Sequence, residues 1–190
     1  MNWLKEHFNF INFFKLVGLT VVFNYFVIGF NGLVSPEGSI YSSFFDQYFN
    51  FIQWNRHLII TISNSVAHYF NTNSYISGPQ MIKIAGGIEV EIWLPCLGFG
   101  IISFWIAFII TNSGTLAKKL RWCIGGIIGI TIINCFRISL FLISLDRNWQ
   151  QTTDLDHHDM FNIAAYVLIA LLMYTYSENS RQSLKPERKI

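Results

Sequence analysis

The sequence predicts an all-α integral membrane protein, a polytopic bundle of four transmembrane helices with one further helix at the outer interface. Hydrophobic residues make up 52% of the 190 residues and charged residues only 13%, whereas soluble domains carry about 25% charged residues. Four apolar segments account for the excess, and each approaches the roughly 20 residues that cross a hydrocarbon core about 30 Å thick. Because lipid cannot satisfy an open sheet edge, we expect these segments to be helices.

The predicted transmembrane helices cover residues 13–30, 92–111, 122–145 and 159–176. The first is expected to be a retained helix and not a signal peptide, because its apolar run is long and no A-x-A-like site follows it. We expect a single membrane domain over residues 1–190. Its parts are an N-terminal transmembrane helix (1–30), an outer interfacial region (31–91), a three-helix core with the reactive residues (92–176) and a basic tail (177–190).

Charge distribution predicts the orientation. Basic residues gather before or at the start of the first helix, between the second and third, and after the fourth: Lys5, Lys15, Lys118, Lys119, Arg121, Arg181, Lys185, Arg188 and Lys189. With four crossings these regions share one side, which the positive-inside rule makes cytoplasmic. The opposite side receives mostly acids: Glu37, Asp46, Glu89, Glu91, Asp146, Asp154 and Asp156. Both termini are therefore expected in the cytoplasm.

The region between the first two helices is aromatic-rich over residues 44–70, but Asp46, Arg56, His57 and Asn64 interrupt it. A further crossing there would place both downstream basic clusters outside. We therefore expect an amphipathic helix that lies at the outer interface. The stretch 71–80, "NTNSYISGPQ", has the composition of an exposed loop.

Three reactive side chains are expected at similar depth near the outer interface. Cys96 lies in the first outer turn of the second helix, and His158 opens the fourth. Arg137 follows Arg121 by sixteen residues, which is about 24 Å along a helix that starts inside. Topology alone thus predicts that a thiol, a guanidinium and an imidazole meet on one side of the membrane.

Cys96 has two interpretations. A buried cysteine often serves as a small hydrophobic residue. Here Pro95 suits the first turn of a helix, whose positive dipole end would favour a thiolate at Cys96. Cys123 and Cys135 lack this setting and are assigned to packing, and three cysteines predict no disulfide framework.

Arg137 also has two interpretations. An arginine in an apolar helix can extend its charge to the headgroups, or it can face a partner or a polar cavity. Asn134, Arg137, Phe141 and Ser144 fall on one helical stripe. A stripe with three polar residues favours a face that contacts protein over one that contacts lipid.

The segment "TTDLDHHDMFN" allows a metal site or a solvated helix start. His157 and His158 stand among Asp154, Asp156 and Asp159, a set that could bind a metal such as zinc. Acidic residues also favour the positive end of a helix. Because successive helical residues point about 100° apart, at most one of the two histidines is expected to act as a base.

The order of these motifs resembles the exosortase/archaeosortase family of membrane-embedded processing enzymes. The motifs here are "LPCLGFG" around Cys96, "NCFRIS" from Asn134 to Ser139 and "HHDMFN" from His157 to Asn162. The resemblance covers roughly residues 85–176. The chain departs from the family in the position of its acids, Glu89 and Glu91, which lie further upstream of the cysteine, and in Leu97, where the family often has Ser or Thr.

The resemblance implies a cysteine peptidase or transpeptidase at the outer face of a bacterial cytoplasmic membrane. Cys96 would be the nucleophile and Arg137 the group that stabilises the oxyanion, with Asn134 hydrogen-bonded to Arg137. The family pattern selects His158 as the base, with His157 as the second choice.

The implied substrates are secreted proteins that end in a short motif, a transmembrane helix and a basic tail. The lipid bilayer is the other partner, and no cofactor, metal or nucleic acid is expected. The alternative is a non-enzymatic or metal-binding membrane protein that uses the Asp/His loop 154–159.

Overall fold

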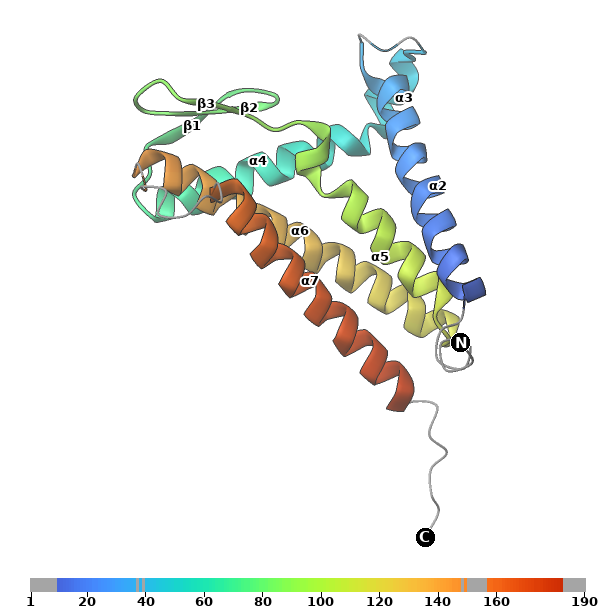
Figure 1. The fold of residues 1–190 in the computed structure, drawn as a ribbon. Coiled ribbons are helices and arrows are strands. Elements are labelled where there is room, and N and C mark those ends of the chain that lie inside the picture. Colours follow the sequence, from blue (N-terminus) through green and yellow to red (C-terminus); the bar gives the residue numbers. More distant parts are fainter. Residues whose placement is uncertain (1–9, 37, 39, 148, 150–156, 183–190) are drawn as a thin grey trace. The chain divides into compact units, whose positions relative to one another are not determined.

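The computed structural model describes residues 10–36, 38, 40–147, 149 and 157–182, with the exception of the side chains of residues 157–160 and 180–182. The described chain is mostly helical (Figure 1). It divides into two compact units, which we describe separately: residues 1–50 with 99–127, and residues 51–98 with 128–190.

The first unit is helical. It contains α2 (Phe10–Val34), α3 (Ser43–Phe49), α5 (Phe99–Thr111) and the first part of α6 (Leu116–Asp146). The buried indole of Trp105 in α5 donates a hydrogen bond to the Trp122 carbonyl at 3.3 Å. A Cβ at Gly126 would overlap that indole, so a glycine is what lets Trp105 lie against the α6 backbone.

The second unit contains α4 (Phe51–Tyr69), three strands, the remainder of α6 and α7 (His157–Gln182). The buried residues of α4 recur at helical spacing: Ile52, Arg56, Ile59, Ile60, Ser63 and Ala67. This confirms an amphipathic helix, and its location at the outer interface stays a prediction. Ser63 donates a hydrogen bond to the Cys135 carbonyl of α6 at 3.1 Å, and Ser139 of α6 donates one to the Ser63 carbonyl at 3.3 Å.

A small antiparallel sheet follows α4, and it corrects the all-α expectation. Its strands are β1 (Ser74–Gly78), β2 (Met81–Ile84) and β3 (Glu89–Glu91), in the order β1-β2-β3. Gly86 and Gly87 have positive φ angles of 126° and 97° in the turn between β2 and β3, a conformation that favours glycine. The stretch 71–80, predicted as a loop, therefore contributes a strand.

The predicted second transmembrane helix is shorter than expected. Residues 92–98 do not join it: the 3-10 helix η1 (Leu94–Leu97) is followed by Gly98 at φ 78°, and α5 begins at Phe99. The 13 residues of α5 extend about 20 Å, less than the roughly 30 Å of a hydrocarbon core. The expectation that Cys96 lies in the first turn of a long α-helix is thus wrong.

The described residues contain three helices long and apolar enough to cross a membrane, namely α2, α6 and residues 161–179 of α7. Their positions confirm three of the four predicted apolar helices. Many large apolar side chains of α2 are exposed, including Phe14, Val22 and Phe26, as expected of a helix that contacts lipid. These features indicate a membrane protein.

Candidate active site

Cys96 lies in a tight turn that connects the sheet to α5. Trp93 before the turn has an extended backbone, and Pro95 is the second residue of η1. The Cys96 amide donates a hydrogen bond to the Trp93 carbonyl at 2.9 Å. Gly98 ends the turn in the left-handed region, where glycine is favoured because it has no Cβ. The half-buried Cys96 side chain is thus presented by a short, locally closed turn.

Two asparagines hold this turn from neighbouring helices. The Asn134 side chain of α6 donates a hydrogen bond to the Cys96 carbonyl at 2.7 Å, and Asn55 of α4 donates one to the Leu97 carbonyl at 3.3 Å. Asn134 is buried, where an unmade hydrogen bond would be costly. The two bonds orient the turn, and with it the thiol.

Arg137 lies one turn beyond Asn134 on α6. Its Nη1 donates a hydrogen bond to Oδ1 of Asn162 in α7 at 2.7 Å. The expected hydrogen bond between Asn134 and Arg137 is wrong, because Asn134 donates to the Cys96 carbonyl and Arg137 donates to Asn162. The prediction that the polar stripe of α6 contacts protein is confirmed: Asn134 and Ser144 are buried, and Arg137 bonds to α7.

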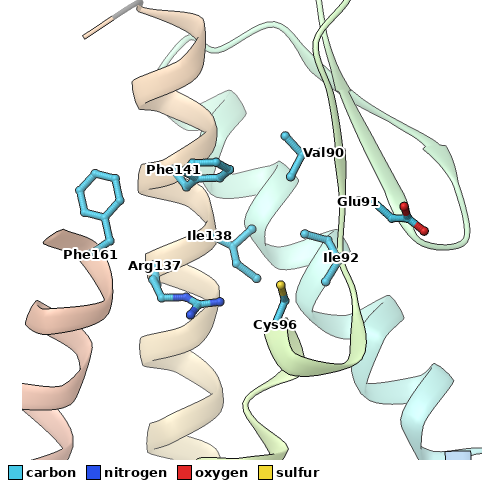
Figure 2. A pocket seen from close by; sticks show the side chains of 8 residues that line it. All are labelled: Val90, Glu91, Ile92, Cys96, Arg137, Ile138, Phe141 and Phe161. Carbon is cyan, nitrogen blue, oxygen red and sulfur yellow. The ribbon is translucent and has the colours of Figure 1, made fainter. Parts of the chain in front are cut away.

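Cys96 and Arg137 line one cavity of about 210 Å³. Its walls come from β3, η1, α6 and α7: Val90, Glu91, Ile92, Cys96, Arg137, Ile138, Phe141 and Phe161. In Figure 2 the guanidinium of Arg137 extends toward Cys96, the sulfur of Cys96 points into the space between Ile138 and Ile92, and the Glu91 carboxylate points away from both. The cavity is smaller than the roughly 300–1,000 Å³ of sites for drug-sized ligands, a size that suits a short piece of an extended chain.

The histidines begin α7, which starts at His157. Position 158 precedes Asn162 by four residues and position 157 precedes Phe161 by four, so each pair shares a face of the helix. The side chains of His157 and His158 lie outside the described residues, as do Asp154 and Asp156. The choice of base and the metal interpretation of this loop therefore stay predictions.

Two contributors to the site were missed from sequence. Asn55 belongs to no recognisable motif, and from the sequence Arg56 was interpreted only as a polar interruption of an apolar stretch. Arg56 is in fact buried on α4, and its Nη1 donates a hydrogen bond to Oε1 of Gln53 at 2.8 Å. Burial lowers the pKa of Arg56, and the nearby Glu91 carboxylate partly opposes that shift. The helical spacing of Ile52, Arg56 and Ile59 was the available signal that Arg56 faces inward.

The bond from Asn134 makes a direct prediction. Asn134→Asp replaces the donor with an acceptor that faces the Cys96 carbonyl, so we expect the free energy of unfolding to fall by about 1–3 kcal/mol. The measurement is detergent-induced unfolding of the purified protein. Asn55→Asp is the matched control, and we expect a smaller loss because its bond is longer and its side chain less buried. Equal losses in both variants would contradict the special role of Asn134.

No protein-family model matches the chain, and neither a curated protein nor a solved structure matches it.

Proposed function

We propose that this protein is a membrane-embedded cysteine peptidase or transpeptidase, similar to exosortases, that cleaves C-terminal sorting signals of secreted proteins. The observation that carries the proposal is that Cys96 and Arg137, far apart in sequence, line the same cavity, with the guanidinium extended toward Cys96. A nucleophile and a fixed cation on facing walls are what acyl transfer requires of a site.

In the proposed reaction the Cys96 sulfur attacks a peptide carbonyl while a base accepts the thiol proton. The new S–C bond converts the carbonyl oxygen into an oxyanion, which the Arg137 guanidinium stabilises. The C–N bond then breaks, and the base returns the proton to the leaving amine. A thioester remains on Cys96 until water or an acceptor amine attacks it and releases the thiol.

His158 is the proposed base. Asn162 accepts a hydrogen bond from Arg137, and position 158 stands one helical turn before Asn162 on the same face of α7. Position 157 shares its face with Phe161, which also lines the cavity, so His157 is the second choice. The Arg137–Asn162 bond favours His158 because it aligns that face with the guanidinium.

The proposed location is the bacterial cytoplasmic membrane, with the site on the outer face and both termini in the cytoplasm. Basic residues around the ends of α2, α6 and α7 support this orientation. The substrates would then present their scissile bond outside, just before the C-terminal transmembrane helix. A basic tail on the inner side would hold that helix in place.

Mapping of C-terminal peptides in cells that do or do not express the protein tests the proposal. We expect a set of secreted proteins to lose a C-terminal helix and basic tail only when the protein is present, as detected by mass spectrometry. Identical C-termini in both cultures would refute the peptidase proposal. A metal-binding function would instead predict a stoichiometric metal in the purified protein, lost in Asp154→Ala and Asp156→Ala.

A further inference from the structure

We propose that the free edge of β3 binds an extended segment of the substrate as an added, antiparallel strand that leads its scissile bond to Cys96. This inference deepens the proposed function, since it assigns the substrate-binding mode of the same site. Such strand addition supplies main-chain hydrogen bonds for affinity, while side-chain pockets supply specificity.

The register of the sheet leaves the edge of β3 unpaired. The amide of Ile92 donates to the Gln80 carbonyl at 2.8 Å, and that of Ile84 donates to the Ile88 carbonyl at 2.9 Å. Hydrogen-bonded pairs alternate along an antiparallel ladder, so Val90 bonds to β2, whereas the main-chain groups of Glu89 and Glu91 point to the other side. In the described part of the chain nothing hydrogen-bonds to those outward groups.

The opposite edge of the sheet has partners at its first residue. Its strand, β1, packs against α4, where Oγ of Ser74 donates a hydrogen bond to Oδ1 of Asn64 at 2.8 Å. The outward amide of Ser74 is also satisfied, by the Thr72 carbonyl at 3.0 Å. Because β3 contributes to the cavity lining and β1 does not, the edge of β3 is the edge of this sheet that lies beside the cavity.

The free edge is continuous with the cavity. Val90, Glu91 and Ile92 line the same space as Cys96 and Arg137. In Figure 2 the side chains of Val90 and Ile92 lie on the side of β3 toward Arg137 and Phe161, and the Glu91 side chain lies on the other side. A peptide carbonyl must be presented to the sulfur in an accessible, extended chain. A strand added along Glu89–Glu91 would lie beside Val90 and Ile92, whose side chains line the cavity.

Charge and hydrophobicity specify the occupant. Glu89 pairs with Lys83 at 2.8 Å, whereas the Glu91 carboxylate has no hydrogen-bonding partner among the described residues, and its charged neighbour is Arg56. An added strand would place alternate side chains on the Glu91 face, where a basic residue is favoured. The intervening side chains would meet Val90, Ile92 and Phe141. The occupant is thus a segment in which basic and apolar residues alternate.

The probe is a fluorescent hexapeptide of alternating valine and lysine, with both ends blocked. Its affinity is measured by fluorescence anisotropy against Cys96→Ala protein in phosphatidylcholine nanodiscs, with empty nanodiscs as the blank. Because Cys96→Ala protein cannot cleave the peptide, the experiment measures binding alone. A failure of the strand-addition inference is thus distinguishable from a failure of the proposed peptidase function, which the C-terminal mapping tests. No saturable binding above the blank overturns the inference.

Backbone N-methylation gives the matched control. In an antiparallel added strand the lysine amides face β3 and the valine amides face away. Methylation of the lysine nitrogens should weaken binding at least tenfold, and methylation of the valine nitrogens should change it less than threefold. Equal effects, or the reverse order, overturn the inference.

Proline substitution tests the protein side of the interaction. Glu91→Pro removes an outward amide without loss of a sheet hydrogen bond, a position where a strand tolerates proline, and should weaken binding about tenfold. Glu91→Ala removes the carboxylate but keeps the main-chain amide, so this variant should retain more affinity for the peptide than Glu91→Pro. Ile76→Pro makes the equivalent change on β1 and should bind as before. Comparable losses in Ile76→Pro and Glu91→Pro, or a dimer that Glu91→Pro dissociates, overturn the inference.

Discussion

Cys96→Ala is expected to abolish processing of secreted precursors while the amount of membrane-inserted protein stays unchanged. The alanine methyl cannot form the thioester, so the reaction loses its covalent intermediate. The Asn134 and Asn55 hydrogen bonds go to main-chain carbonyls of the turn, which the substitution retains. The measurement is the ratio of full-length to truncated precursor by mass spectrometry, with an immunoblot of the tagged protein as the measure of its amount.

Cys123→Ala is the matched control, since Cys123 is half-buried like Cys96 but is not among the residues that line the cavity. We expect normal processing in that variant. Iodoacetamide should inactivate wild-type protein and the Cys123→Ala variant alike, with Cys96 as the modified residue. Normal processing in Cys96→Ala, or inactivation only through Cys123, would rule out Cys96 as the nucleophile.

Arg137→Gln is expected to lower kcat for precursor cleavage by about 10²–10³, with a smaller effect on KM. Loss of one group that stabilises an oxyanion has an effect of this size. Glutamine keeps a donor for Oδ1 of Asn162 but removes the charge that faces Cys96. The measurement is steady-state cleavage of a precursor identified by C-terminal mapping, with the purified protein in nanodiscs.

Two variants distinguish the charge of Arg137 from its geometry. Arg137→Lys keeps the charge but not the planar group with several donors, so its kcat should fall between those of the wild type and Arg137→Gln. Arg147→Gln removes an exposed arginine directly after α6, whose Nη2 donates to the Phe70 carbonyl at 2.8 Å, and should leave kcat near the wild-type value. A mere rise in KM for Arg137→Gln would place Arg137 in substrate binding and not in catalysis.

Local patterns were sufficient where the relevant interactions are local. The apolar runs of α2, α6 and α7 and the amphipathic character of α4 follow from residues spaced along one helix, so they were predictable from the sequence. The same holds for the stripe of Asn134 and Arg137, because residues three apart on a helix share a face. The cavity-lining positions of Cys96 and Arg137 agree with the predicted convergence of these two residues.

Nonlocal pairing accounts for what the sequence did not show. The strands of the sheet are three to five residues long and are stabilised by one another, so no helical or alternating run of useful length marks them. That pairing carries the chain up to Ile92, and Pro95 and Gly98 then shape the turn that delays α5. A run of apolar letters from 92 to 111 conceals this break.

The sequence by itself determined the membrane character of this protein, its helical segments and the reactive residues available to it. Only the tertiary structure decided which of those residues are partners. Asn134 bonds to Cys96 across 38 positions, and Arg137 bonds to Asn162 across 25. Hydrogen bonds of this kind depend on how separate segments pack, because the energy of each bond requires an approach within about 3 Å that no local pattern encodes.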